Sequence, residues 1–303
     1  MHLSKDTWGC VVAESVSFYF LLCSYAFGGT RFLASVRELK IGPKHPVRVM
    51  GVINLSPESF YKKSVAGSTD EFIEMLKRTV SEGADLIDIG GASTAPKSIY
   101  RTSDISREEE INRVKAAMEF IDDIKQPVSI DTTSAAVAEI ALDLGASMVN
   151  DISGFRHDPK MAELVANRDV PVVLMANCGS PCTSIKASLN SLEHSLTIAR
   201  NHAIDSKMII LDPGIGFGKL PEVDLEILRN LDRFVNLGYP LLVGVSRKAF
   251  IGHLLDQNDP DDRLIGTIAA TAIAVMNGAN IIRAHDVKEA RIAAHLGCAL
   301  RKR

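Results

Sequence analysis

The sequence has few cysteines and almost no excess charge of either sign. Its five cysteines are an odd number scattered over 303 residues, which argues against a disulfide framework and favours reduced thiols in the cytoplasm. Cys178 and Cys182 have the spacing of a metal pair, but no second cysteine pair follows to complete a zinc site. Lys and Arg number 34 against 37 Asp and Glu, so we expect no general nucleic-acid surface, and any positive site must be local.

Long uncharged apolar runs are also lacking. The apolar stretch Val11–Phe27 is interrupted by Glu14 and is shorter than the ~20 residues that a membrane span needs. Its flanks do not match a secretory signal. We therefore expect no membrane partner. Residues 1–46 are assigned to an N-terminal extension of uncertain structure, which is either an extra strand or hairpin packed outside the main domain or an extension upstream of the native start.

One pattern recurs from residue 47 onward. A short β-branched run is followed by a turn containing Gly or Asp, and then by an amphipathic segment of helical length. Short apolar runs bounded by turn residues are typical of strands buried on both faces of a parallel sheet. Eight such strands are predicted, at Arg48–Ile53, Ala84–Ile89, Pro127–Ile130, Ser147–Val149, Pro171–Met175, Met208–Leu211, Pro240–Val243 and Asn280–Ile282.

The intervening segments predict helices at Asp70–Glu82, Ser134–Leu144 and Glu222–Leu237, and Asp286 with Glu289 resembles a capping box for the last one. Eight strand–helix alternations over ~250 residues match a (β/α)₈ TIM barrel. A doubly wound open sheet is the alternative, but no G-x-G-x-x-G follows the first strand. We predict one barrel domain over residues 47–303, with the extra N-terminal segment in front of it.

Polar residues follow nearly every predicted strand. In such a barrel the carboxyl ends of the strands form one rim, where the active site lies. Any one of these residues could be an ordinary turn former or helix cap. Polar residues at almost every strand exit nevertheless predict a shared site. They are Asn54, Ser93, Thr94, Asp131, Asn150, Asp151, Asp212, Ser246, Arg247, Lys248, Arg283 and His285.

These residues divide into two chemical groups. Asp131, Asn150 and Asp212 offer acceptors, or paired donor and acceptor edges, suited to a flat heterocycle with amino and ring N–H donors. A second group, Arg247, Lys248, Arg283 and His285, offers positive charge near the starts of the last two helices, where a TIM barrel often binds phosphate. The rim therefore predicts a ligand with a nitrogenous ring and a phosphate.

Seven ordered motifs carry a resemblance to a known family. They are Met50–Phe60 (MGVINLSPESF), Asp88–Thr94 (DIGGAST), Ile130–Thr132 (IDT), Val149–Ile152 (VNDI), Leu211–Lys219 (LDPGIGFGK), Ser246–Gly252 (SRKAFIG) and Arg283–Val287 (RAHDV). Together they resemble the signatures of the dihydropteroate synthase family, from about residue 48 to 292.

The resemblance implies that 6-hydroxymethyl-7,8-dihydropterin diphosphate is condensed with 4-aminobenzoate or a related arylamine, with release of diphosphate. The diphosphate leaves first, the pterin stabilises the cationic methylene, and the amine attacks. Asp131, Asp212 and Lys248 carry the catalytic roles. Substrate-binding positions are Thr94, Asp131, Asn150, Asp212, Lys248, Ser246, Arg247, Arg283 and His285. Mg²⁺ is the implied cofactor, bound through Asn54, and the family implies a homodimer that pairs through late barrel helices.

Some positions depart from the family pattern. Ala95 stands where Arg is usual, and Tyr61-Lys62-Lys63 replaces a short acidic and glycine segment. One hypothesis is that Lys62, Lys63 and Lys97 accept a phosphorylated arylamine, as in an archaeal-type homologue. The segments 56–68 and 92–104 are candidate lids that keep water from the cation. Two other functions stay open: a pterin-dependent methyltransferase acting with a corrinoid protein, and a non-catalytic pterin-binding barrel.

Overall fold

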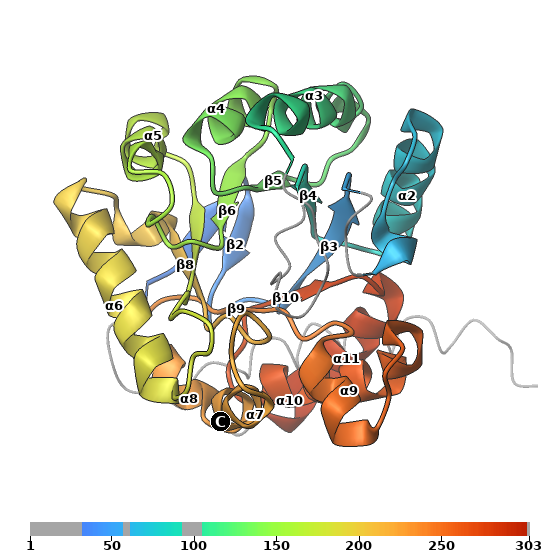
Figure 1. The fold of residues 1–303 in the computed structure, drawn as a ribbon, viewed down its shortest axis with the longest axis vertical. Coiled ribbons are helices and arrows are strands. Elements are labelled where there is room, and N and C mark those ends of the chain that lie inside the picture. Colours follow the sequence, from blue (N-terminus) through green and yellow to red (C-terminus); the bar gives the residue numbers. More distant parts are fainter. Residues whose placement is uncertain (1–31, 57–60, 93–104, 302–303) are drawn as a thin grey trace, which may run out of the picture.

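The computed structural model describes residues 32–56, 61–92 and 105–301. Eight parallel strands run in the order β8-β7-β6-β5-β4-β3-β10-β9, and a parallel bridge between Leu211 and Leu241 brings the two outer strands together (Figure 1). This arrangement confirms the predicted (β/α)₈ barrel. The strands are β3 (Arg48–Asn54), β4 (Leu86–Gly90), β5 (Val128–Asp131), β6 (Met148–Asp151), β7 (Val172–Met175), β8 (Ile209–Asp212), β9 (Leu242–Val243) and β10 (Ile281–Ala284). Each lies within two residues of its predicted bounds.

Helices surround the strands on the outside of the barrel (Figure 1). They are α2 (Thr69–Ser81), α3 (Arg107–Met118), α4 (Ala135–Asp143), α5 (Lys160–Arg168), α6 (Ile185–Asn201), α7 (Pro221–Arg229), α8 (Leu231–Val235), α9 (Ala249–Leu255), α10 (Leu264–Met276) and α11 (Val287–Leu300). Short 3₁₀ turns occupy Lys62–Ser64 (η1), Ile121–Asp123 (η2), Ser206–Met208 (η3) and Pro260–Arg263 (η4). None of the helices in the described part of the chain is long and apolar enough to cross a membrane.

Two helix predictions need correction. The single helix expected over Glu222–Leu237 is divided into α7 and α8 at Asn230, where φ is −117° and ψ is 36°. Asp286 precedes α11 but its side chain makes no capping hydrogen bond, so the predicted capping box is wrong. Its carboxylate binds Arg247 instead. A charged guanidinium is a stronger partner for a carboxylate than a neutral backbone N–H.

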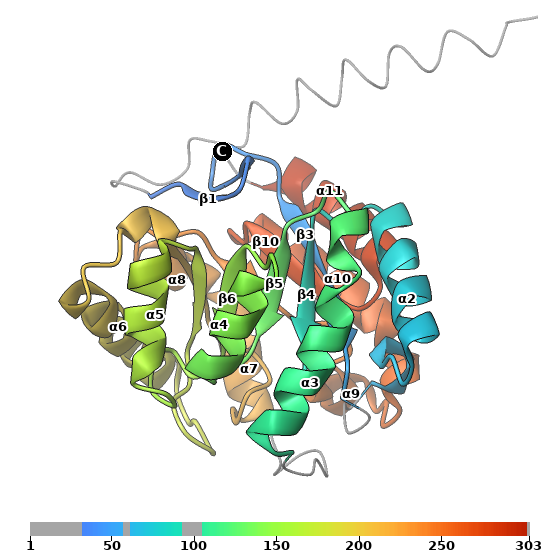
Figure 2. The same cartoon turned by 90° about the horizontal axis from the view of Figure 1, so that it is seen from above.

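A two-stranded hairpin closes the end of the barrel opposite the rim. Strands β1 (Ala34–Val36) and β2 (Leu39–Ile41) pair in antiparallel fashion, and Figure 2 shows them lying across that end. Their buried side chains Ala34, Val36 and Ile41 form one apolar cluster with the first inward-facing layer of the barrel. That layer consists of Met50, Leu86, Met148, Val173, Ile210, Leu242 and Ile281.

The inward-facing layer above it is largely polar, and this change positions the site. Side chains alternate across a strand with a period of two, so the residue two places further along faces the same interior. Leu86 is followed in this way by Asp88, Met148 by Asn150, Ile210 by Asp212 and Ile281 by Arg283. The barrel is therefore an apolar core at the hairpin end and a charged site at the rim.

The expectation of reduced thiols is wrong for one pair of cysteines. Cys178 and Cys182 form a disulfide in the loop between β7 and α6, with their Cα atoms 5.4 Å apart. The turn through Gly179 and Pro181 brings two cysteines four positions apart within bonding range. The loop also contacts the β8–α7 loop, because the Cys182 N–H donates to the carbonyl of Gly218 at 2.7 Å.

Candidate active site

Five charged or polar side chains meet inside the rim of the barrel. Asp88 lies on β4, and Asp131, Asn150, Asp212 and Arg283 lie at or near the ends of β5, β6, β8 and β10. The first four are at most 7% exposed. Four of the five were predicted from their places at strand exits. Asp88 was not, because it lies within a strand rather than after it.

An ion-pair network joins three of the acidic and basic groups. The guanidinium of Arg283 donates from Nε to Oδ2 of Asp88 at 2.6 Å and from NH2 to Oδ2 of Asp131 at 2.7 Å. The amide of Asn150 donates from Nδ2 to the same Asp88 oxygen at 3.0 Å. Arg283 is thus held between two carboxylates on the inside of the barrel, and its orientation is fixed by both.

Burial raises the pKa of two carboxylates at the rim, Asp131 and Asp212. Removal from water disfavours the charged form and raises the pKa of Asp131 to about 7, although Arg283 beside it acts in the opposite direction. Burial also raises the pKa of Asp212, opposed by the charge of Lys248 and by the Gly214 N–H, which donates to Oδ1 at 2.7 Å. Both carboxylates are buried acceptors, and the protonation of Asp131 can change near neutral pH.

Lys248 lies immediately before α9 and points toward the β8–α7 loop. Its ammonium donates to the carbonyl of Ile215 and lies 4.5 Å from the centre of the Phe217 ring. Burial lowers the pKa of Lys248 to about 8, opposed by the nearby carboxylates Asp212 and Asp224. The stem of the side chain packs against Gly216, where a Cβ atom would be 2.6 Å from Lys248 Cδ.

Asp212 and Lys248 lie within electrostatic reach of Arg283 and His285. Asp212 is influenced by both Lys248 and Arg283, and His285 is influenced by Arg283 and Lys248. Arg283 and the Lys248 ammonium also approach the same side of Gly244, with Arg283 Cβ at 3.6 Å and Lys248 Nζ at 3.8 Å from the position of a Cβ there. The acceptor-rich and cationic groups predicted from the sequence therefore share one site.

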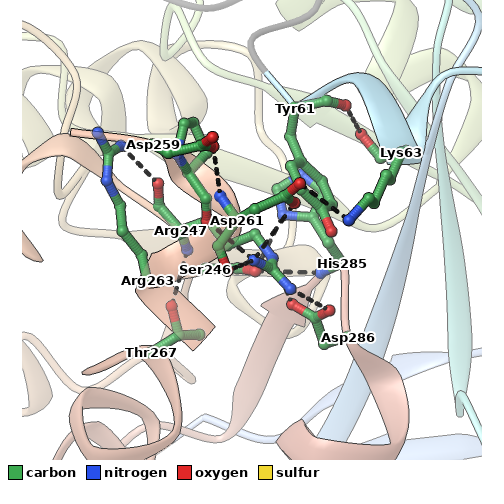
Figure 3. A network of polar contacts seen from close by, with 12 residues as sticks. Tyr61, Lys63, Ser246, Arg247, Asp259, Asp261, Arg263, Thr267, His285 and Asp286 are labelled. Carbon is green, nitrogen blue, oxygen red and sulfur yellow. Dashed lines mark hydrogen bonds and ion pairs between the residues drawn. The ribbon is translucent and has the colours of Figure 1, made fainter. Parts of the chain in front are cut away.

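Arg247 is adjacent to Lys248 but has a different environment. Its guanidinium donates to both oxygens of Asp286 at 2.8 Å and to the carbonyls of Pro260 and Asp261 at 2.8 and 2.9 Å (Figure 3). The ring of Tyr61 lies 4.5 Å from it. All of these contacts are made within the protein, so Arg247 ties the β9–α9 turn to the β10–α11 turn. Its role in substrate binding stays a prediction.

His285 and Ser246 form a second pair at the rim. The imidazole Nδ1 lies 2.9 Å from Ser246 Oγ, and the ring packs edge-on against Tyr61 with 5.0 Å between ring centres (Figure 3). Burial and, to a smaller extent, the neighbouring cations Arg283, Arg247 and Lys248 together lower the pKa of His285 to about 3. This low pKa favours a neutral imidazole near pH 7, whereas the sequence predicts positive charge at this position.

Asn54, the predicted magnesium ligand, lies at the end of β3. Its Nδ2 donates to Ser64 Oγ at 2.7 Å, which leaves the amide oxygen as the end available to a hard cation. No cluster of three His, Cys, Asp or Glu side chains suited to a metal occurs among the described residues. A cation here would therefore need further oxygens from a bound phosphate or from water, which is usual for Mg²⁺.

Two predicted features lie partly or wholly outside the described residues. Thr94, with Ala95 and Lys97, falls in the segment 93–104, as does most of the second candidate lid. In the first candidate lid, residues 57–60 lie outside the described residues. Lys63 is inside it, and its ammonium forms an ion pair with Asp261 at 2.8 Å (Figure 3).

Sequence reasoning also missed residues that shape the site from behind. Lys219 is 5% exposed and donates to the carbonyls of Gly214 and Ala176 at 2.6 and 3.1 Å, which joins the loops after β7 and β8. Asp224 is 2% exposed and accepts from the Gly216 N–H at 2.7 Å. For Asp88 a signal was present: it stands two residues after a core leucine, as Asn150 stands two residues after a core methionine.

The fold and the rim define a TIM-barrel protein with an inward-facing polar site at the carboxyl ends of its strands. The chain belongs to the family of pterin binding enzymes, which matches residues 50–285. It is 40% identical over 263 residues to a dihydropteroate synthase of Bacillus subtilis, covering 86% of this chain and 90% of that one. A dihydropteroate synthase of Clostridium beijerinckii is 42% identical over 258 residues, covering 84% and 93%.

Solved structures show the same similarity. A dihydropteroate synthase from Coxiella burnetii in complex with pteroic acid has a TM-score of 0.79 and 32% identity, covering 91% of this chain and 99% of that one. The Xanthomonas albilineans enzyme in complex with 7,8-dihydropteroate has a TM-score of 0.75 and 31% identity, covering 86% and 96%.

Proposed function

We propose that this protein is a dihydropteroate synthase, a transferase of folate biosynthesis that forms a C–N bond. It condenses 6-hydroxymethyl-7,8-dihydropterin diphosphate with 4-aminobenzoate and releases diphosphate. The observation that carries this function is the meeting of Asp131, Asn150, Asp212 and Lys248 with Arg283 and His285 at one rim, in a barrel of the pterin binding family.

The inner part of the site suits the pterin ring. Carboxylates of Asp131 and Asp212 accept hydrogen bonds from ring N–H and amino groups, and the amide of Asn150 offers one more acceptor. The Lys248 ammonium is a donor for the ring oxygen and nitrogen. A buried negative charge at Asp212 also stabilises positive charge that develops on the ring as the diphosphate leaves.

The outer part of the site suits the leaving group. Arg283 supplies positive charge, while Ser246 and the neutral His285 supply polar contacts for phosphate oxygens. Asn54 is the residue we propose to hold Mg²⁺, because Ser64 fixes its amide with the oxygen available. When bound together with diphosphate, this cation would neutralise charge on the leaving group.

The second substrate is best explained as plain 4-aminobenzoate. The hypothesis of a phosphorylated arylamine in an archaeal-type homologue depended on positive charge at Lys62, Lys63 and Lys97, and of these Lys63 is paired with Asp261. The Xanthomonas albilineans enzyme, 32% identical, was solved with 4-aminobenzoic acid. A pterin-dependent methyltransferase has no need of a diphosphate site, so the cationic rim does not favour that alternative.

We also propose a homodimer in the cytoplasm. Large apolar side chains are exposed on α10 and α11, with Ile265 78%, Ile292 62%, Leu296 54% and Leu300 58% accessible. Contiguous exposed apolar side chains commonly mark a protein interface.

A diphosphate-release assay with the pterin diphosphate and 4-aminobenzoate tests the function. We expect turnover by the wild-type protein, no preference for a phosphorylated arylamine, and a loss of at least ~100-fold in kcat/KM for Lys248→Ala and for Asp212→Asn. Lys186→Ala, on the exposed surface of α6, is the control and should keep wild-type activity. Absence of arylamine-dependent diphosphate release from the folded wild-type protein would reject the proposal.

A further inference from the structure

Asp88 is a fully buried acid for which the pterin and diphosphate contacts described above leave no direct task. It lies in the middle of β4 and is 0% exposed. A carboxylate taken out of water loses its hydration, and the loss must be offset by hydrogen bonds and opposite charge. Such a group is therefore costly to the fold, and its contacts indicate what it does.

The contacts of Asp88 cross the inside of the barrel. Its Oδ2 accepts from Asn150 Nδ2 at 3.0 Å and from Arg283 Nε at 2.6 Å. In the sheet order, β6 and β10 each stand two strands away from β4, on opposite sides. Only an inward-pointing side chain can reach both. One oxygen atom thus connects a residue of the pterin pocket with a residue of the diphosphate site.

Each contact restricts the orientation of a substrate-binding group. The amide nitrogen of Asn150 is turned toward Asp88, so its oxygen is the end left for a donor on the pterin ring. Arg283 donates from Nε to Asp88 and from NH2 to Asp131, so its plane cannot rotate without breaking one of the two contacts. Preset orientation of this kind raises the reaction rate because the groups need not reorganise when substrate binds.

We propose that Asp88 is a positioning residue that aligns Asn150 for the pterin ring and Arg283 for the departing diphosphate. The proposal rests on the proposed function, and it assigns to Asp88 an action through these two residues rather than on the substrate. It predicts that the position and the charge of this carboxylate have separate consequences, which allows it to be distinguished from a merely structural role.

The charge of Asp88 acts on Asp131. Facing Asp131 are Arg283 from β10, Asp88 from β4, Glu110 from α3 and Asp151 from β6. The negative charge of Asp88 raises the pKa of Asp131, as do those of Glu110 and Asp151, whereas Arg283 lowers it. Neutralising Asp88 therefore lowers the pKa of Asp131 and moves the acidic limb of the rate profile to lower pH.

The test compares Asp88→Asn with Asp85→Asn in the full-length protein. Asp85 is a matched control because it stands just before the same strand, at the end far from the rim, and pairs with Arg48 and Arg291. Three quantities are measured: the affinity for 6-hydroxymethylpterin by calorimetry, kcat and KM for diphosphate release, and the pH dependence of kcat/KM. Thermal unfolding of each variant is recorded beside them.

For Asp88→Asn we expect a pterin affinity about 10-fold lower, a kcat/KM about 100-fold lower, and an acidic limb at lower pH than in the wild type. Asp85→Asn should keep kcat/KM within about twofold of the wild-type value, and the acidic limb of its pH profile should stay at the wild-type pH. Two results for Asp88→Asn overturn the proposal. One is a reduced kcat/KM whose acidic limb lies at the wild-type pH, and the other is a kcat/KM and a pterin affinity close to those of the wild type.

A second variant covers the case in which Asp88→Asn does not fold. Asp88→Glu keeps the charge but displaces the carboxylate, so pterin affinity should fall while the acidic limb stays in place. Wild-type affinity in Asp88→Glu overturns the proposal. If the wild-type protein binds the pterin but releases no diphosphate, the proposed function fails while the comparison of affinities still decides the role of Asp88. A wild-type protein that does neither overturns both.

Discussion

Arg247 and Asp286 form a two-point ion pair, with Nε and NH2 of the guanidinium each 2.8 Å from a different oxygen of the carboxylate. The pair joins the turn before α9 to the turn before α11. It therefore also holds in place Lys248, which follows Arg247 in the chain, and His285, which precedes Asp286. The pair thus supports the site by fixing these two turns relative to each other.

This pair predicts a loss of stability for Arg247→Lys. Lysine cannot reproduce the two parallel hydrogen bonds or the contacts to Pro260 and Asp261, and the Arg247 side chain is only 6% exposed. We expect the free energy of unfolding in urea to fall by about 3 kcal/mol. Arg168→Lys, in the more exposed pair with Asp143, is the control and should cost under ~1 kcal/mol. Equal losses in the two variants would contradict this role.

The rate should depend on pH through Asp131 and Lys248. Burial raises the pKa of Asp131 to about 7, and this carboxyl must be ionised to accept hydrogen bonds from the pterin. Burial lowers the pKa of Lys248 to about 8, and this amine must be protonated to donate hydrogen bonds to the pterin. We therefore expect kcat/KM to be highest between pH 7 and 8 and to fall on both sides. Lys248→Arg should abolish the fall above pH 8 in whatever activity remains, because arginine stays charged. If kcat/KM of Lys248→Arg still falls above pH 8 as in the wild type, that fall is due to the titration of another group.

The same shift predicts how stability changes with pH. The pKa of Asp131 in the folded protein is about 7, above the value of about 4 for an unfolded aspartate, so the folded state holds a proton that the unfolded state releases. The contribution of Asp131 to the free energy of unfolding is therefore fully present below pH ~4 and is lost as the pH rises to about 7. The difference between the urea-unfolding curves of the wild type and Asp131→Asn, measured across this range, should show that slope.

Gly216→Ala should displace Lys248. The new Cβ would be 2.6 Å from Lys248 Cδ, and φ at this position is +77°. Gly179→Ala is a matched control, because φ there is +89° and a Cβ would have nothing within 4 Å. Both variants carry similar backbone strain, so any loss of stability in Gly216→Ala beyond that in Gly179→Ala reports the displacement of Lys248. Only Gly216→Ala should lower kcat/KM by more than ~10-fold, and similar kinetics in both would show that the contact has no influence on Lys248.

The dimer proposal predicts that charge on α10 and α11 prevents association. We expect Ile265→Lys combined with Leu296→Lys to sediment as a monomer at micromolar concentration, while the wild type sediments as a dimer. Leu254→Lys on α9, where the leucine is 60% exposed, is the control and should leave the dimer intact. If the wild type sediments as a monomer, the exposed apolar surface of α10 and α11 does not mediate a homodimer.

The strands and the site were predictable to different degrees. All eight barrel strands followed from β-branched runs between turns, because parallel strands are buried on both faces and leave that mark locally. Asp131, Asn150 and Asp212 were found because strand exits meet at one rim. Asp88 was missed because the prediction relied on strand exits, whereas Asp88 lies inside a strand, two residues after a core leucine. Its role also depends on residues that are distant in the chain.

Neighbouring residues with the same charge could not be told apart in advance. Arg247 and Lys248 both read as anion contacts, but one faces Asp286 and the other the β8–α7 loop. The turn between them decides this, since Arg247 has a φ of +55° and the two side chains diverge. The disulfide between Cys178 and Cys182 was likewise decided by a turn whose shape the count of cysteines did not contain.

By itself, the sequence determined the order of strands and helices, the burial of each strand and the rim on which chemistry occurs, since hydrophobic periodicity is a local property of the chain. Only the tertiary structure decided which basic side chain pairs with which acidic side chain. Arg283 meets Asp88 across 195 positions and Arg247 meets Asp286 across 39. Closure of the barrel brings these groups together, and the low polarity of the closed interior makes their mutual contacts the decisive ones.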